Sequence, residues 1–243
     1  MNYKLLTLLF LCLFSFGFIN KNDDDGQVKK VNEPSLLAAN NKVIVKTPAQ
    51  LFFENIVENE FSLPQFDCFS KAFEGYNQLR SQGIVQKDFL TIIDFSLSSK
   101  EERLWVIDMV SKKIILRSLV AHGRNSGEEF ANRFSNKAES FQSSLGFYST
   151  GEVYHGKHGM SLRLDGLEYG INDNARNRAV VIHGADYVSE KFAIANGRLG
   201  RSLGCPAVPY AIHKQFINII KDKSCLFIYH PSRTYLVKSK LVS

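Results

Sequence analysis

Short runs of β-favouring residues, separated by turn signals, occupy most of the chain beyond Lys87 and restrict its fold more than any other feature. The runs are rich in Val, Ile, Leu, Phe and Tyr, and dipeptides such as Ser-Lys at 111–112 and Asp-Gly at 165–166 separate them. We expect strands at residues 89–97, 104–110, 113–120, 144–148, 161–164, 179–183 and 225–230. The runs on either side of 111–112 predict a hairpin. This pattern predicts a mainly β fold, either a β-sandwich or a barrel-like sheet, with peripheral helices.

Two helices are expected outside the sheet. Between Pro64 and Gly83, aromatic residues and a leucine recur at steps of three and four, the spacing of one buried helix face. A second amphipathic helix is expected at 209–221. A chain of 243 residues with 44% hydrophobic content is long enough to bury one sizeable core. We therefore expect residues 61–243 to form one domain that begins with a helix.

The first twenty residues are typical of a secretory signal peptide. Lys4 supplies the positive charge, and an apolar run follows at 5–19. That run is short for a membrane span, which needs about 20 apolar residues. No clear small-x-small pattern precedes Asn20, so an uncleaved membrane tether stays open as the alternative. Residues 21–60 begin with a polar, acidic stretch and are expected to form a flexible linker.

Charge and cysteine content narrow the function classes. The 30 Lys and Arg against 24 Asp and Glu make the chain mildly basic. No dense Lys/Arg tract with interleaved aromatics occurs, so nucleic-acid binding is not expected. His155 and His158 have no accompanying Cys, Asp or Glu pattern, so we expect no metal site and no cofactor. Beyond the signal, the cysteines are Cys68, Cys205 and Cys225, an odd number that leaves at least one thiol unpaired.

One of these cysteines lies in a pattern that suits nucleophilic chemistry. Cys205 stands between a glycine and a proline, in a place that favours a loop. The apolar run at 179–182 delivers His183 to a strand end, where an imidazole can take the proton of a nearby thiol. Gly204, just before the cysteine, helps the backbone N–H groups turn toward an oxyanion. Ser202 is a candidate to cap this turn or orient the histidine, with an ordinary loop serine as the alternative.

The order His-Gly, then a stretch, then Ser-x-Gly-Cys resembles the signature of the bacterial L,D-transpeptidase catalytic domain. The phrases "YHGKHGMSLRLDGLE" and "GRLGRSLGCPAVP" are similar to the branch known as murein L,D-transpeptidase catalytic domain proteins. The likeness covers residues 90–229. It implies a mostly β fold in which the cysteine attacks the peptide bond after the diamino acid of a peptidoglycan tetrapeptide stem. D-Alanine would leave, and the acyl group would pass to an amine of another stem or to a lipoprotein lysine.

The resemblance also assigns roles to single residues. It implies Cys205 as nucleophile, His183 as base, and Ser202 and Gly204 as further members of the catalytic motif. For substrate binding we expect Gly184, His122, Arg198 and Arg201. The two arginines are candidates to bind the carboxylates of the stem, since a guanidinium matches a carboxylate at two points. The alternatives are that His122 is a structural turn histidine and that Arg198 and Arg201 are solvated loop arginines.

This chain departs from the pattern of the family it resembles just after the cysteine. Many members carry an arginine or another polar residue there, where this chain has Pro206 and Ala207. The departure leaves the substrate class and the length of the donor open. Peptidoglycan stem peptides are the expected partners, the cell envelope or periplasm of a bacterium the expected location, and a monomer the expected state.

Other functions remain as alternatives. Transfer of the acyl group to water would make the protein an L,D-carboxypeptidase on the same stems. A non-catalytic peptidoglycan-binding envelope protein would use Cys205 only structurally. Sortases prefer a Thr-x-Thr-Cys phrase that this chain lacks, and papain-like wall hydrolases place the cysteine before the histidine.

Overall fold

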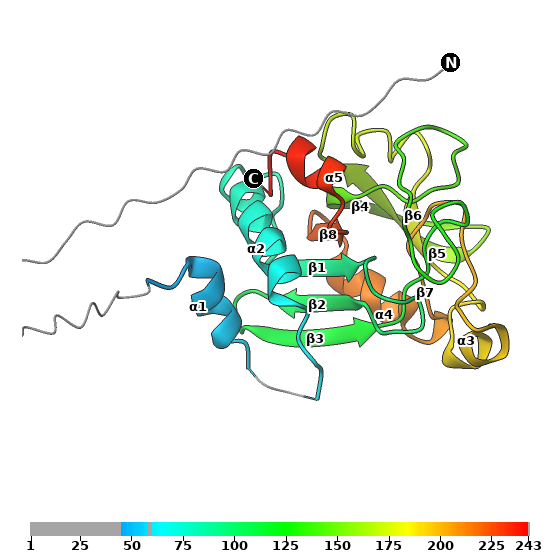
Figure 1. The fold of residues 1–243 in the computed structure, drawn as a ribbon, viewed down its shortest axis with the longest axis horizontal. Coiled ribbons are helices and arrows are strands. Elements are labelled where there is room, and N and C mark those ends of the chain that lie inside the picture. Colours follow the sequence, from blue (N-terminus) through cyan, green and yellow to red (C-terminus); the bar gives the residue numbers. More distant parts are fainter. Residues whose placement is uncertain (1–44, 58–59, 243) are drawn as a thin grey trace, which may run out of the picture. The chain divides into compact units, whose positions relative to one another are not determined.

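A computed structural model describes residues 45–57 and 60–242 of the chain. Its helices and strands follow one another as shown in Figure 1. In chain order they are α1 (Pro48–Glu54), α2 (Phe66–Ser81), β1 (Phe89–Asp94), β2 (Leu104–Asp108), β3 (Lys113–Ser118), β4 (Gly146–Gly156), β5 (Gly159–Gly166), β6 (Val181–Gly184), α3 (Glu190–Asn196), β7 (Ala207–Val208), α4 (Tyr210–Ile220), β8 (Cys225–Tyr229) and α5 (Arg233–Lys238).

The strands of the described residues form a single sheet in the order β3-β2-β1-β8-β4-β5-β6-β7. The pairs β1·β8 and β6·β7 are parallel, and the other neighbours are antiparallel. Beyond β3, Ala121 bridges Ala207 of β7, and Gly123 bridges Ser202. The chain that leaves one edge of the sheet thus reaches the other edge, and the sheet nearly closes. A mainly β, barrel-like fold with peripheral helices is confirmed.

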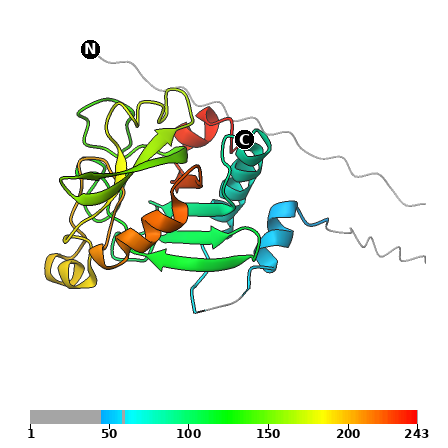
Figure 2. The same cartoon turned by 180° about the vertical axis from the view of Figure 1, so that it is seen from behind.

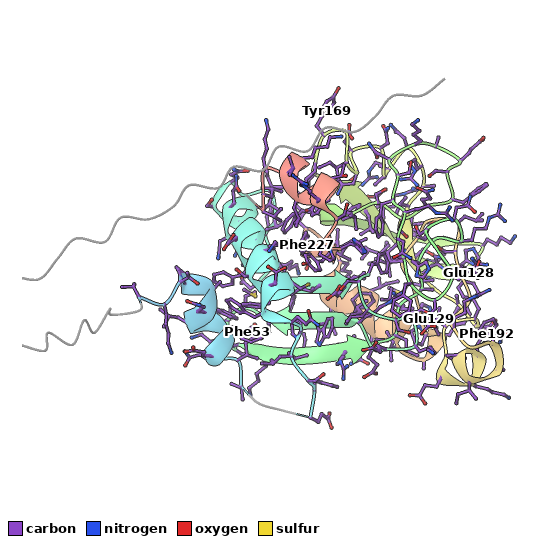
Figure 3. The ribbon with its side chains drawn as sticks, in the orientation of Figure 1. Phe53, Glu128, Glu129, Tyr169, Phe192 and Phe227 are labelled. Carbon is purple, nitrogen blue, oxygen red and sulfur yellow. The ribbon has the colours of Figure 1, made fainter. Side chains whose placement is uncertain are left out.

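Helices cover the two faces of the β1–β2–β3 part of the sheet. Figures 1 and 2 show α2 on one face and α4 on the other. Phe227 of β8 lies near the centre of the molecule in Figure 3, and its ring stacks on that of Phe147 with centroids 4.2 Å apart. Both side chains are fully buried. Within the described residues, no helix has the length and apolar character needed to cross a membrane.

The expected elements are largely present. The helix predicted between Pro64 and Gly83 is α2, and the helix predicted at 209–221 is α4. The hairpin around 111–112 joins β2 and β3, with Lys112 in the left-handed region at φ 54°. The sequence did not predict α3, α5 or the two-residue β7, and it predicted only the first part of β4.

The expected flexible linker at 21–60 is wrong for residues 45–57, which belong to the folded unit. Thr47 caps α1 in a capping box, with the Gln50 N–H donating to Thr47 Oγ1 at 3.2 Å. Pro48 occupies the first turn, where its missing N–H costs nothing. Phe53 packs on Phe69 of α2 with ring centroids 5.0 Å apart. The expected signal peptide at 1–20 and the linker at 21–44 lie outside the described residues.

Candidate active site

His183 lies near the end of β6, where an apolar strand carries it to the edge of the core. Its side chain is only 4% exposed. Its Nδ1 lies 2.9 Å from the carbonyl oxygen of Gly184. Because a carbonyl can only accept, Nδ1 carries the proton and Nε2 is left with its lone pair. The imidazole is therefore held in the tautomer that a general base requires.

Cys205 lies on the loop that enters β7, beside the strand that carries His183. The parallel register pairs His183 with Ala207, which puts Cys205 next to Val181, two residues earlier on each strand. The Val181 N–H donates to Cys205 Sγ at 3.4 Å, and Sγ donates to the Ala179 carbonyl at 3.7 Å. Cys205 is partly exposed, whereas Cys68 and Cys225 are buried, and none of the three forms a disulfide.

Ser202 and Gly204 fix the shape of the cysteine loop. The Ser202 hydroxyl donates to the Cys205 carbonyl at 2.6 Å and accepts from the Gly204 N–H at 3.0 Å. Gly204 has φ +127°, and a Cβ there would lie 2.9 Å from the Gln142 carbonyl oxygen. Ser143 Oγ donates to the Gly204 carbonyl at 3.1 Å. Both residues that the sequence selected before the cysteine therefore build the turn that presents it.

The surroundings of Cys205 and His183 favour the uncharged form of both side chains. Burial raises the pKa of the Cys205 thiol, although the Val181 N–H and the charge of Arg178 oppose this shift. Burial lowers the pKa of His183, while its hydrogen bond to Gly184 opposes the shift. A neutral thiol and a neutral imidazole suit a mechanism in which the base takes the proton as the sulfur attacks.

Side chains from distant segments surround His183. The ring of His158, at the tip of the β4–β5 hairpin, stacks on the His183 ring with centroids 4.4 Å apart and planes 24° apart. On the α4 side, Gly184 packs closely: a Cβ there would lie 2.5 Å from the ring of Tyr210 and 3.0 Å from that of His213. Gly184 is thus needed for close packing of β6 against α4. The sequence suggested His158 only as a weak metal candidate. Its contact with His183 could not be found from the sequence, because it depends on how far the β4–β5 hairpin reaches.

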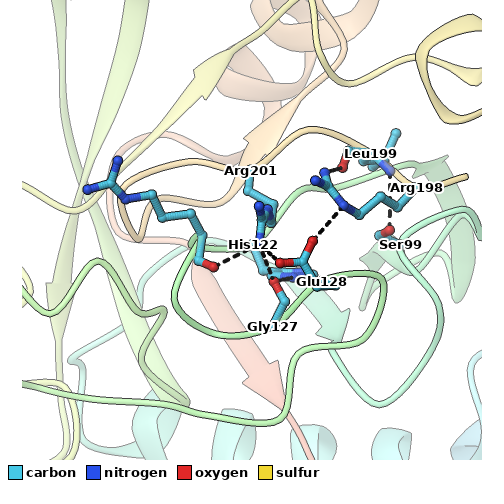
Figure 4. A network of polar contacts seen from close by, with 8 residues as sticks. Ser99, His122, Gly127, Glu128, Arg198, Leu199 and Arg201 are labelled. Atoms are coloured by element: carbon cyan, nitrogen blue, oxygen red, sulfur yellow. Dashed lines mark hydrogen bonds and ion pairs between the residues drawn. The ribbon is translucent and has the colours of Figure 1, made fainter. Parts of the chain in front are cut away.

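Arg198 and Arg201 share one carboxylate instead of standing free for substrate. Figure 4 shows Glu128 between them. Arg198 Nε lies 2.9 Å from one Glu128 oxygen, and Arg201 Nη1 lies 2.6 Å from the other. Arg201 also donates to the carbonyls of Arg124 and Gly127, each at 3.0 Å. In the structure these arginines hold the 124–128 loop, and their role as substrate ligands stays a prediction.

His122 does not line a cleft, because its side chain is 1% exposed. Arg103 Nη2 donates to His122 Nδ1 at 2.8 Å, and the ring meets Phe95 edge to face. Burial, with the charge of Arg103, lowers the pKa of His122 to about 3. His122 is therefore a structural turn histidine, and its carbonyl accepts from the Ser202 N–H at 3.0 Å. In the described part of the chain, no group of three or more His, Cys, Asp or Glu could hold a metal ion.

Comparison with known proteins gives a family match. A family model described as the L,D-transpeptidase catalytic domain matches residues 62–229. No curated protein matches the sequence significantly.

Solved structures give more distant similarities. An L,D-transpeptidase from Mycobacterium smegmatis is 10% identical, with a TM-score of 0.36 and coverage of 59% of each chain. The helical cell shape determining protein Pgp2 (K307A mutant) from Campylobacter jejuni is 14% identical, with a TM-score of 0.36 and coverage of 74% of this chain and 62% of its own. Bd1075 from Bdellovibrio bacteriovorus is 14% identical, with a TM-score of 0.37 and coverage of 59% and 48%. This chain thus spans less than two thirds of each of these three chains.

Proposed function

Because the chain belongs to the family of L,D-transpeptidase catalytic domains, we propose that it is a cysteine acyltransferase acting on peptidoglycan stem peptides. One observation carries the proposal. Cys205 lies directly beside the strand that carries His183, and the Nδ1 hydrogen bond of this histidine to Gly184 leaves Nε2 free to accept a proton. No other cysteine in the described residues is even partly exposed.

The proposed reaction has two halves. In the first, Cys205 Sγ attacks the carbonyl carbon of the diamino acid in a tetrapeptide stem, and its proton passes to His183 Nε2. The C–N bond to D-alanine then breaks, and His183 returns the proton to the leaving amine. In the second half, an amine of another stem attacks the thioester and gives its proton to His183. The new amide forms as the C–S bond breaks, and His183 gives the proton to the sulfur, which restores the thiol.

The developing oxyanion needs backbone donors. The Gly204 N–H already donates to Ser202 Oγ. The Cys205 N–H, by contrast, makes no hydrogen bond to any of the described residues. We therefore assign the Cys205 N–H as an oxyanion donor and give Ser202 and Gly204 the role of holding the turn that aims it. The proposed location remains the cell envelope, where stem peptides occur.

Incubation of the full chain with a disaccharide-tetrapeptide, followed by mass spectrometry, tests the proposal. Release of D-alanine together with a cross-linked dimer supports transpeptidation, and D-alanine alone supports the L,D-carboxypeptidase alternative. Cys205→Ala and His183→Ala should both lose D-alanine release. His155→Ala, an exposed position on the β4–β5 hairpin, is the matched control and should keep it. No release by the wild-type protein, or activity that survives Cys205→Ala, would overturn the assignment.

A further inference from the structure

Arg178, five residues before His183, lies beside the cysteine loop and has no carboxylate partner among the described residues. We propose that Arg178 is a positioning residue that fixes the Cys205 thiol and holds an uncompensated positive charge next to it. This inference rests on the proposed role of Cys205 as nucleophile. Arg178 could not be selected from the sequence, because its importance depends on contacts with residues more than thirty positions away.

The hydrogen bonds of the Arg178 guanidinium go to neutral groups of the 135–144 segment. Nη1 donates to the Ser135 carbonyl at 2.7 Å and to Ser144 Oγ at 2.5 Å. Nη2 donates to the Gln142 carbonyl at 2.7 Å and to Ser140 Oγ at 3.3 Å. These partners hold the half-buried guanidinium in place but do not cancel its charge. Arg198 and Arg201 differ, because Glu128 neutralises much of their charge.

The same arginine begins the segment that holds the sulfur. Ala179, the next residue, has φ +54°, a left-handed conformation that is unfavourable for a non-glycine residue. The Ala179 carbonyl accepts from Cys205 Sγ, and the Val181 N–H donates to Sγ. Both hydrogen-bond partners of the thiol therefore follow Arg178 directly, and anchoring Arg178 to the 135–144 segment keeps this strained turn in place.

The guanidinium also approaches the cysteine loop itself. Its Nη2 lies 3.5 Å from the point where a Cβ of Gly204 would stand. The Gln142 carbonyl that it binds lies 2.9 Å from the same point. The positive charge is thus adjacent to the nucleophile, where it stabilises the thiolate against the penalty of burial. Without it, less of the sulfur would be ionised at any given pH.

Alkylation of Cys205 by iodoacetamide measures this effect without any peptidoglycan substrate. The thiolate displaces iodide, an S–C bond forms, and the proton is lost to solvent. The rate is followed between pH 7 and 9.5 on the full chain, with modified peptides identified by mass spectrometry. At pH 8, Arg178→Gln should react about tenfold more slowly than wild type, and its pH profile should shift upward. Arg178→Lys, which keeps the charge, should recover most of the rate.

Arg124→Gln is the matched control, because Arg124 is an exposed arginine near the same loop that stacks on Phe141 at 4.3 Å. Its pH profile should equal that of the wild type. A profile of Arg178→Gln that also equals wild type, in a protein with unchanged circular dichroism, would overturn the inference. A loss of rate that Arg178→Lys does not recover would overturn the charge role.

A second measurement decides the case in which Arg178→Gln does not fold. In the wild type, the ratio of the iodoacetate rate to the iodoacetamide rate at Cys205 should exceed that of free cysteine and fall with added salt, because the nearby cation attracts the anionic reagent. A ratio at or below that of free cysteine would overturn the inference. These outcomes are independent of D-alanine release, so failure of the proposed function and failure of the role of Arg178 are distinguishable.

Discussion

Gly204→Ala tests whether the cysteine loop needs its unusual backbone. Gly204 has φ +127°, which an L-residue rarely adopts, and an added Cβ would lie 2.9 Å from the Gln142 carbonyl oxygen. Backbone strain of this kind costs about 1–3 kcal/mol. In a domain of this size, about 1 kcal/mol lowers the Tm by about 2–4 °C, so we expect a fall of about 2–12 °C. Relief of the contact must move either the loop or the Gln142 backbone.

That movement should affect activity more than stability. Gly204 precedes the nucleophile, and a displacement of about 1 Å at a reacting group can cost about 100-fold in rate. Gly197→Ala is the matched control, because Gly197 also has a positive φ, of 70°, but nothing lies within 4 Å of an added Cβ. This variant should lose about 1–2 kcal/mol of stability and keep its activity.

Both variants are measured by thermal unfolding and by release of D-alanine from the disaccharide-tetrapeptide. The expected result is a similar loss of Tm in the two proteins but a large loss of rate only in Gly204→Ala. If Gly204→Ala keeps the wild-type rate, the loop does not depend on this backbone conformation. If Gly197→Ala loses as much rate, positive φ alone is responsible, and the contact with Gln142 is irrelevant.

Three further changes probe the surroundings of the pair. His158→Ala removes the ring stacked on His183 and exposes the imidazole, so the pKa of His183 should rise and the acid limb of the kcat/KM–pH profile should move to higher pH. His155→Ala on the same hairpin should leave that limb unchanged. A shift of the His158→Ala limb to lower pH would contradict the reasoning. Ser202→Ala removes the hydroxyl that bonds both ends of the cysteine loop and should lower the free energy of unfolding in urea by about 1–3 kcal/mol. Ser202→Thr should recover most of this loss. Equal stability of the wild type and both variants would exclude this role. Glu128→Gln should change the unfolding free energy by less than about 1 kcal/mol, because its carboxylate is largely exposed, and a larger loss would show that the ion pairs are structural.

The sheet was predictable from sequence because its strands alternate with clear turn signals. The expected runs at 89–97, 104–110 and 113–120 contain β1, β2 and β3. β7 was not predictable, since two residues carry no periodic signal and its pairing depends on β6, more than twenty residues earlier. α1 was missed for a different reason. Its capping box and Phe52–Phe53 pair span only seven helical residues next to a polar stretch, too few for a clear periodic signal.

The candidate site was predictable only in its chemistry. A cysteine in a Gly-Cys-Pro loop and a histidine at a strand end suit a nucleophile and its base, and the structure places them on neighbouring segments. Which arginines carry free charge could not be predicted, since this depends on Glu128, seventy and more residues away from Arg198 and Arg201. The burial of His122 could not be predicted either, because only the fold brings Arg103 against it.

The departure from the family pattern just after Cys205 has a structural explanation. Pro206 is buried and, by restricting the residue before it, favours an extended Cys205 that leads into β7. Ala207 is fully buried and exchanges backbone hydrogen bonds of 2.8 and 3.3 Å with Ala121, the contact that nearly closes the sheet. A charged side chain at this position would have to be buried without a partner, at a cost of several kcal/mol. Position 207 in this chain therefore joins the two edges of the sheet. Any recognition of substrate carboxylates must come from residues that approach Cys205 from elsewhere.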